Sequence, residues 1–346
     1  MQSNQGHDRR QFFGGLAATV LAAGLRPASA QDNRLVVPTY GGRYERFWRD
    51  VLIPPFEQKT GLKTVLDIGL GANFATKLRA SGPDNPPYSY LMANEFVGAV
   101  LRSEGYFEPW PMDRVPNLAK IHSKANPNNQ GVTVMFSPIG IAYRKDLVKK
   151  PPRSWRDLWD NPDIKGRVGL YEITNTAGFM FLMMTSKVYG SGPMDFDAGF
   201  RQIERLKPFP EAGLAGALAV LLTRGEVVAG PLDFGETLSM QKKDIPVAWA
   251  APAEGMFMFD QTFSLLKNGP NKSAGCAFLD YMLSEDVQAK LAGEFSGVPV
   301  NRNVKLPPDQ QPLTVEDLDK IVAFDWVAAN KVRDSVIERW NRMTRG

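Results

Sequence analysis

Residues 252–266 read PAEGMFMFDQTFSLL, and the apolar run from Met256 onward holds a single carboxylate, Asp260. A Pro-x-Glu-Gly turn opens the run, and a loop of turn-forming residues, KNGPNK at 267–272, follows it. We therefore expect a strand with one embedded charge. Because burial of an ionised carboxylate is costly without a positive partner, Asp260 is a candidate ligand-binding residue; a helix cap or a surface carboxylate is the alternative.

Two helices are predicted after this loop. The first has apolar residues at the i, i+3, i+4, i+7 and i+8 spacing of one buried face, namely Ala274, Ala277, Phe278, Tyr281 and Met282. Ser284 is expected to cap the second helix, whose first turn carries two acidic residues. The stretch ends in a Pro-Val-Asn turn at 299–301.

A second pattern lies upstream, with Ser-Trp-x-x-Leu-Trp at 154–159 and Lys-Gly-Arg-Val at 165–168. Ser154 is expected to cap a short helix on which Trp155 and Trp159 share a buried face at i, i+4 spacing. Together these motifs resemble family 1 extracellular solute-binding proteins of ABC importers, in particular their polyamine- and iron-binding branch. The resemblance covers essentially the whole chain after residue 30.

The resemblance implies an α/β protein with the two-domain type II periplasmic binding fold, in which parallel-rich sheets carry helices on both faces and hinge strands join the domains. It also implies that a small-molecule ligand binds in the interdomain cleft, that the domains close on it, and that a membrane permease and an ATPase are the partners. We expect domain 1 at 31–137 plus 263–307, domain 2 at 138–262, and a C-terminal helical segment at 308–346. That segment includes an amphipathic helix predicted over 325–342.

The first 30 residues resemble an export signal. Residues 8–13, DRRQFF, resemble the twin-arginine consensus, residues 14–25 form an uncharged and mostly apolar segment, and Ala-Ser-Ala at 28–30 is a small-residue cleavage site. A segment of this length is too short to cross a bilayer, which needs about 20 apolar residues. We therefore expect a mature chain that begins at Gln31 and is a periplasmic monomer without membrane insertion.

Composition excludes several function classes. Loss of residues 1–30 lowers the formal net charge from +4 to +2, which provides no basic field for nucleic acid. The mature chain then keeps one histidine, His122, and one cysteine, Cys276, so a histidine zinc site, a Ser-His-Asp triad and an internal disulfide have little support. We expect no cofactor, no metal site and no catalysis. A periplasmic enzyme on the same fold is the alternative from another class.

The order strand-helix-strand-helix-strand-helix over residues 35–103 predicts a parallel sheet. Its first helix is expected to stop before Pro54. In open parallel sheets, ligands lie beyond the carboxyl ends of the strands. The candidate residues of the first domain are therefore Thr39, Tyr40, Gly41, Gly42, Asp67, Gly71, Asn73 and Glu95. A tight turn alone also explains the two adjacent glycines.

The second domain offers a similar set at predicted strand ends. Residues 171–174 lead from a strand into a helix N-terminus suited to a polar ligand group, although a capping role explains Thr174 equally well. The candidates here and on the returning strand are Tyr171, Glu172, Thr174, Asp233, Phe257, Phe259 and Asp260.

Carboxylates with aromatic side chains favour a polyamine or a similar organic cation, because carboxylates pair with ammonium groups and aromatic faces attract them. One departure from the resemblance is Met258, which stands where polyamine binders have a tryptophan. Ferric iron is the alternative ligand, since tyrosine and carboxylate oxygens are the hard donors it prefers. However, the adjacent tyrosine pair typical of ferric binders is missing from the sequence.

Overall fold

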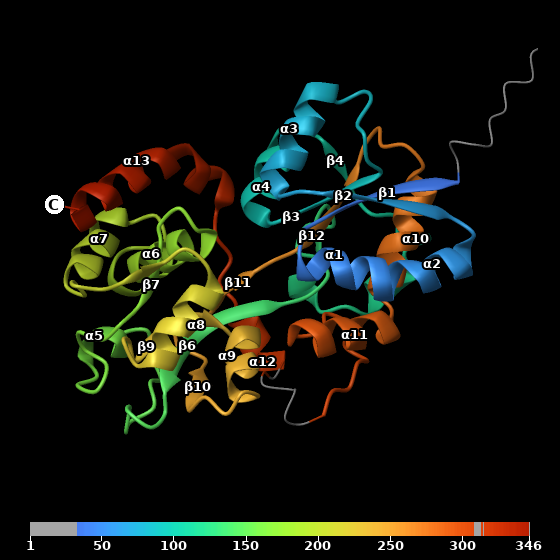
Figure 1. Ribbon diagram of the computed structural model, residues 1–346. Helices are drawn as coiled ribbons and strands as arrows, with labels where there is room; N and C mark the ends of the chain where they lie inside the picture. Colours follow the sequence, from blue (N-terminus) through green and yellow to red (C-terminus); the bar gives the residue numbers. More distant parts are fainter. Residues whose placement is uncertain (1–32, 308–312, 314, 346) are drawn as a thin grey trace, which may run out of the picture.

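The computed structural model describes residues 33–307, 313 and 315–345, so the predicted export signal lies outside the described residues. Two bodies lie side by side, with the first unit on the right and the second unit on the left of Figure 1. Strands β6 (Ser137–Arg144) and β11 (Phe257–Phe259) lie where the chain passes between them.

In the first unit, β1 (Arg34–Thr39) and β2 (Lys63–Ile68) pair in parallel, as the sequence predicts. The third predicted strand, β3 (Tyr90–Ala93), instead pairs antiparallel with β12 (Thr262–Leu266), which also pairs with β4 (Phe107–Glu108) and β5 (Val132–Thr133). The central strand of this sheet, β12, therefore lies more than 150 residues after β3 in the sequence, and the periodicity of residues 35–103 gives no indication of it.

The helical segments of the first unit are α1 (Arg43–Phe47), the π-helical η1 (Trp48–Leu52), α2 (Ile53–Thr60), α3 (Gly71–Ser81), α4 (Glu95–Ser103), the 3-10 turns η2 (Pro116–Lys120) and η3 (Ser123–Ala125), α10 (Lys272–Met282) and α11 (Glu285–Phe295).

The helix expected to stop before Pro54 does not stop there. Helical structure continues from η1 into α2, whose first turn contains the two prolines. Proline is tolerated in a first turn because its missing N–H would have no intrahelical partner there. The switch from π-helical to α-helical geometry just before the prolines gives α2 that first turn.

The second unit is built around β6, which pairs antiparallel with β9 (Ala229–Asp233), β10 (Val247–Ala250) and β11. A short parallel pair, β7 (Leu170–Tyr171) and β8 (Glu211–Ala212), lies beside it. Its helices are α5 (Asp157–Asp160), α6 (Thr176–Tyr189), α7 (Phe196–Glu204), α8 (Ala215–Arg224) and α9 (Phe234–Gln241).

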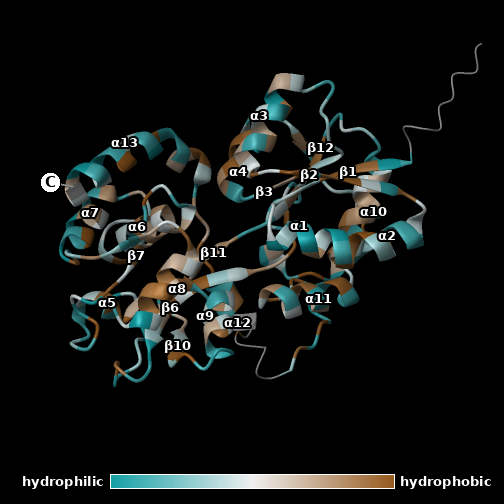
Figure 2. Cartoon of the chain, viewed as in Figure 1, coloured by the Kyte–Doolittle hydropathy of each residue, from teal (hydrophilic) through white to brown (hydrophobic). Residues whose placement is uncertain are grey.

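The C-terminal segment contains α12 (Val315–Asp319) and α13 (Trp326–Arg345). Figure 2 shows α13 as mostly hydrophilic, with hydrophobic residues at intervals along it. Three of these, Ala329, Val336 and Trp340, are buried in the hydrophobic cluster of the second unit. This confirms the predicted amphipathic helix, because one stripe packs and the other face meets solvent.

The two motifs that carried the resemblance contact each other in the structure. Trp155 stacks on Phe257 with ring centroids 5.5 Å apart, and its indole Nε1 donates a hydrogen bond to the carbonyl of Gly255 at 2.8 Å. Glu254 of the Pro-x-Glu-Gly turn accepts hydrogen bonds from the hydroxyl of Ser154 and the N–H of Trp155. Trp155 precedes the four-residue α5 rather than lying on it, but it is buried as predicted, and so is Trp159.

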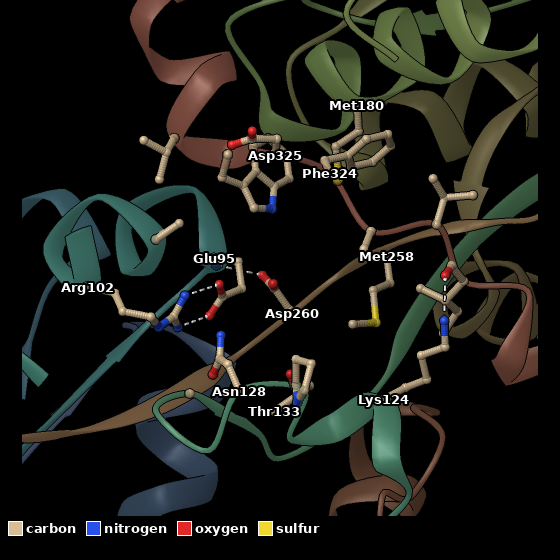
Figure 3. Close-up of a pocket in the computed structure, with 18 residues that line it drawn as sticks. Glu95, Arg102, Lys124, Asn128, Thr133, Met180, Met258, Asp260, Phe324 and Asp325 are labelled. Atoms are coloured by element: carbon tan, nitrogen blue, oxygen red, sulfur yellow. Dashed lines mark hydrogen bonds and ion pairs between the residues drawn. The ribbon is translucent and has the colours of Figure 1, made fainter. Parts of the chain in front are cut away.

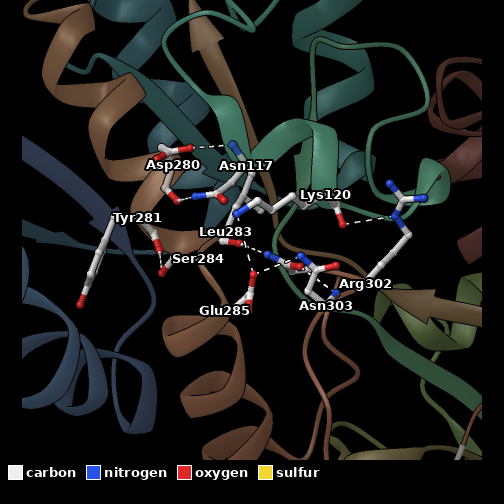
Figure 4. A network of polar contacts seen from close by, with 10 residues as sticks. Asn117, Lys120, Asp280, Tyr281, Leu283, Ser284, Glu285, Arg302 and Asn303 are labelled. Atoms are coloured by element: carbon white, nitrogen blue, oxygen red, sulfur yellow. Dashed lines mark hydrogen bonds and ion pairs between the residues drawn. The ribbon is translucent and has the colours of Figure 1, made fainter.

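The Pro-Val-Asn turn is held by a polar network that joins it to α10, α11 and η2 (Figure 4). Asn301 Nδ2 donates to the carbonyl of Leu283 at 2.8 Å, and its Oδ1 accepts from the N–H of Asn303. Ser284 stands at the N-cap of α11, yet its hydroxyl donates back to the carbonyl of Tyr281 at 2.6 Å rather than capping α11. Hydrogen bonds of the turn thus fix residues 299–303 to the first unit.

Candidate functional site

A cavity of about 340 Å³ lies where the two units meet (Figure 3). The first unit contributes residues of α4, β5 and the loop before β5, and the second unit contributes Met180 of α6. The chain that returns between the units supplies Met258 and Asp260. Residues 321–327, which lead into α13, complete the wall.

Asp260 stands between β11 and β12 and points toward the N-terminus of α4 (Figure 3). Its Oδ1 accepts a hydrogen bond from the N–H of Glu95 at 3.1 Å. Burial, and next the nearby charge of Glu95, raise the pKa of Asp260 from 3.8 to about 7. Among the described residues, no side chain forms an ion pair with Asp260.

Glu95 and Arg102 form a bidentate ion pair along one face of α4. The guanidinium nitrogens of Arg102 lie 2.7 and 2.8 Å from the two carboxylate oxygens of Glu95. Gly131 lets this pair lie against the neighbouring loop, since a Cβ there would come within 2.5 Å of Arg102. The charge of Glu95 is therefore neutralised within the protein, and such fork-to-fork pairs hold a defined geometry.

The remaining wall of the cavity is largely apolar. Met180, Met258, Phe324 and Trp326 line it, and flexible thioethers beside aromatic rings suit the methylene groups of a small ligand. Lys124 also lines the cavity, and its ammonium donates one long hydrogen bond of 3.4 Å to the carbonyl of Ile321.

Helix α13 links the two units next to this cavity. Its first turns reach the first unit, where Asn330 Nδ2 donates to the carbonyl of Phe96 at 2.9 Å. One turn later, Arg333 lies over the ring of Phe96 at 5.0 Å and donates to the carbonyl of Thr174 in the second unit at 3.1 Å. These contacts join the two rims of the cavity.

The structure brings some of the predicted site residues together. Glu95 and Asp260 both line the cavity. Tyr40 lies close enough to Asp260 that the carboxylate charge, after burial, raises the pKa of its hydroxyl. Tyr171 packs edge-on to Phe259 at 6.5 Å and is fully buried.

Asp233 caps α9, where its Oδ1 accepts from the N–H of Glu236 at 2.8 Å. Burial is the larger cause that raises its pKa from 3.8 to about 6, and the charge of Glu236 adds to it. Burial raises the pKa of Tyr171, and the charge of Asp233 adds to the shift, so the two side chains are near each other. A capping bond and a raised pKa coexist because the loss of hydration outweighs the hydrogen bond.

Other predicted residues have structural partners that account for them. Asp67 accepts hydrogen bonds from Lys77 at 2.7 Å and Tyr88 at 2.6 Å, and these bonds outweigh burial and lower its pKa. Asn73 caps α3 through the N–H of Leu70 at 3.0 Å. Phe257 is fully buried against Trp155, so it presents no surface to a ligand.

The last group of predicted residues lies at strand ends without reaching the cavity wall. Thr39 is buried, and Gly71 is packed so that a Cβ there would lie 3.2 Å from that of Ala93. Those that are exposed are Gly41, Gly42, Glu172 and Thr174.

A model of the bacterial extracellular solute-binding protein family matches residues 52–316. The chain belongs to this family. Two relatives from Pseudomonas aeruginosa are a putrescine/agmatine-binding protein, 22% identical over 81% of this chain and 83% of its own length, and a gamma-aminobutyric acid-binding protein, 23% identical over 90% and 92%. A solved ABC transporter structure from Clostridium perfringens superposes with a TM-score of 0.78 and 26% identity, over 90% of this chain and 99% of its own.

These findings confirm the predicted fold and the predicted function as the substrate-binding component of an ABC transporter. Proteins of this kind bind a small ligand and deliver it to a permease. Every helix within residues 33–307 and 315–345 is too short or too polar to span a bilayer.

Sequence reasoning missed several residues that line the cavity of this solute-binding protein. They are Arg102, Lys124, Met180, Phe324, Asp325 and Trp326. One local signal was available, since the Phe-Asp of 324–325 places a carboxylate directly after a phenylalanine, as Phe-Asp at 259–260 does. The other residues carry no such signal, because they come from segments that meet only in the folded protein.

Proposed function

We propose that this protein captures a small solute carrying at least one ammonium group, as polyamines do, and binds that group at Asp260. The observation that carries the proposal is a partly buried carboxylate with a raised pKa that lines an interdomain cavity. A ligand ammonium beside it would supply the opposite charge that the protein does not. The names of two relatives, for putrescine or agmatine and for gamma-aminobutyric acid, support an amine.

Titration calorimetry of the mature protein tests the proposal. An amine such as putrescine, spermidine or 4-aminobutanoate should release binding heat, and mass spectrometry should detect an amine carried through gentle purification. Binding of a simple anion or a neutral sugar, with heat from no amine, would contradict the proposal.

Ferric iron, the alternative ligand, has weaker support. Within the described residues, no three His, Cys, Asp or Glu side chains are grouped so that they could hold a metal ion. Tyr88 is engaged with Asp67, and Tyr90 is stacked on Phe263 inside the sheet core. We therefore favour the amine.

The setting is also part of this proposal. We propose that residues 1–30 direct twin-arginine export and are removed, and that the mature protein works as a monomer in the periplasm. The domains proposed are 31–137 plus 263–307 and 138–262, with 308–346 as the C-terminal helical segment. The solute would be held between them, in reach of Glu95, Asp260, Tyr40, Phe259 and Asp233. We expect no turnover of the bound solute.

Closure of the two domains on the ligand should be measurable by small-angle scattering. A ligand that bridges both units stabilises the closed state selectively, so the radius of gyration should fall when a saturating amine is added. The contacts of Asn330 and Arg333 with Phe96, already made in this structure, are ones that we expect a bound ligand to stabilise. An unchanged radius of gyration at saturation would count against hinge closure.

Affinity for an amine should rise between about pH 5 and pH 8. With a pKa near 7, Asp260 is mostly protonated at pH 5, while an alkylammonium stays charged throughout. Below pH 7, each drop of one pH unit should weaken binding by up to about tenfold. Stability of the free protein should move the other way: the folded-state pKa lies above the unfolded value, so the free energy of unfolding falls as pH rises from about 4 to about 7. A flat calorimetric profile would exclude Asp260 as the partner.

A further inference from the structure

We infer that the solute is a zwitterion, and that Lys124 binds its anionic group while Asp260 binds its ammonium group. The class of ligand is a small aminoalkyl acid, with a carboxylate or phosphonate at the end away from the amine. This inference rests on the proposed function, because it concerns the second end of the same solute.

Five charged side chains line the cavity, and three of them have their charges compensated. Glu95 and Arg102 neutralise each other through two short contacts. Asp325 is exposed to solvent and accepts a hydrogen bond from the N–H of Ala328 at 2.9 Å at the positive N-terminus of α13, so water and the helix together offset its charge. The two that remain, Asp260 and Lys124, carry opposite signs.

The ammonium of Lys124 has hydrogen-bond donors that the protein does not use. Its backbone N–H is fixed by Nδ1 of His122 at 3.1 Å, but the ammonium makes only the long bond to the carbonyl of Ile321. In the described part of the chain, no carboxylate lies within ion-pair distance of it. An ammonium has three donors, so an anion that enters the cavity finds a partner there.

The positions of the two charges suit an elongated ligand. Figure 3 shows Asp260 and Lys124 on opposite sides of Met258, with the ammonium of Lys124 directed at the carbonyl of Ile321. Methylene groups that span the two charges would lie on Met258 and the nearby aromatic side chains. A diamine in the same position would place its second ammonium near Lys124, where like charges repel.

Matched ligand pairs test the inference. Diamines and ω-amino acids of the same chain length, such as putrescine and 4-aminobutanoate, differ only at one terminus. Across chain lengths of two to six carbons, with 2-aminoethylphosphonate added, calorimetry at pH 7.5 should show that the best zwitterion binds at least about tenfold more tightly than the best diamine.

Variants assign the effect to Lys124. Lys124→Met keeps the length and removes the charge, so it should weaken zwitterion binding by roughly 30-fold or more and should leave diamine binding unchanged or stronger. Lys290→Met is the control, because Lys290 pairs with Asp286 on the surface of α11. It should change neither affinity.

The inference and the proposed function fail in different ways. Tighter binding of a diamine by the native protein, or an equal loss for both ligand classes in Lys124→Met, would overturn the inference and leave amine capture intact. If butanoate, which has no amine, binds as well as 4-aminobutanoate, the role of Asp260 fails instead.

Discussion

Asp260→Asn should weaken binding of an amine by roughly 30-fold to several thousand-fold, which corresponds to about 2 to 5 kcal/mol. The loss is large because Asp260 is partly buried in the cavity wall, where water screens its charge poorly. The nearest cavity carboxylate, Glu95, is already paired with Arg102 and does not replace it.

The substitution is a clean test because it preserves shape. An asparagine oxygen can still accept the hydrogen bond from the N–H of Glu95. It also removes a carboxylate that burial and Glu95 make costly to ionise, so the variant should be at least as stable as the native protein at pH 7.5. Asp286→Asn, in an exposed pair on α11, is the matched control and should bind normally. Native affinity in Asp260→Asn would remove the central observation of the proposed function.

Trp155→Ala should cost about 3 to 5 kcal/mol of stability, as expected for deletion of a fully buried aromatic side chain. Trp155 is stacked on Phe257, contacts Phe181 with ring centroids 5.6 Å apart, and donates to the carbonyl of Gly255. Its removal would therefore leave a cavity and an unpaired carbonyl in the core of the second unit. Urea denaturation followed by circular dichroism measures the loss.

A second tryptophan separates stability from binding. Trp326 lines the cavity and is only partly buried, so Trp326→Ala should weaken amine binding more than it weakens the fold. Trp155→Phe, which keeps a ring to stack on Phe257, should recover part of the lost stability. If Trp155→Ala kept its stability but lost its affinity, the structural role assigned to Trp155 would be wrong.

Local patterns in the sequence determined much of which side chains are buried. The spacing of Ala274, Ala277, Phe278, Tyr281 and Met282 predicted the packed face of α10; Ala274, Phe278 and Met282 are buried, and the other two are partly buried against the same cluster. Likewise, an isolated carboxylate in an apolar run marked Asp260 as a costly charge that needs a partner, and the raised pKa agrees with that expectation. These properties depend on residues close together in the chain, which is why periodicity and composition reveal them.

Which side chains lie next to each candidate site residue was decided only by the tertiary structure. Asp67 and Asp260 both looked like strand-end carboxylates, but Asp67 meets Lys77 and Tyr88, whereas Asp260 faces a cavity. Lys124 and Trp326 reach that cavity from segments far apart in the sequence. A site of this kind depends on non-local strand pairing and on the docking of α13, and neither leaves a periodic trace in the residues that it brings together.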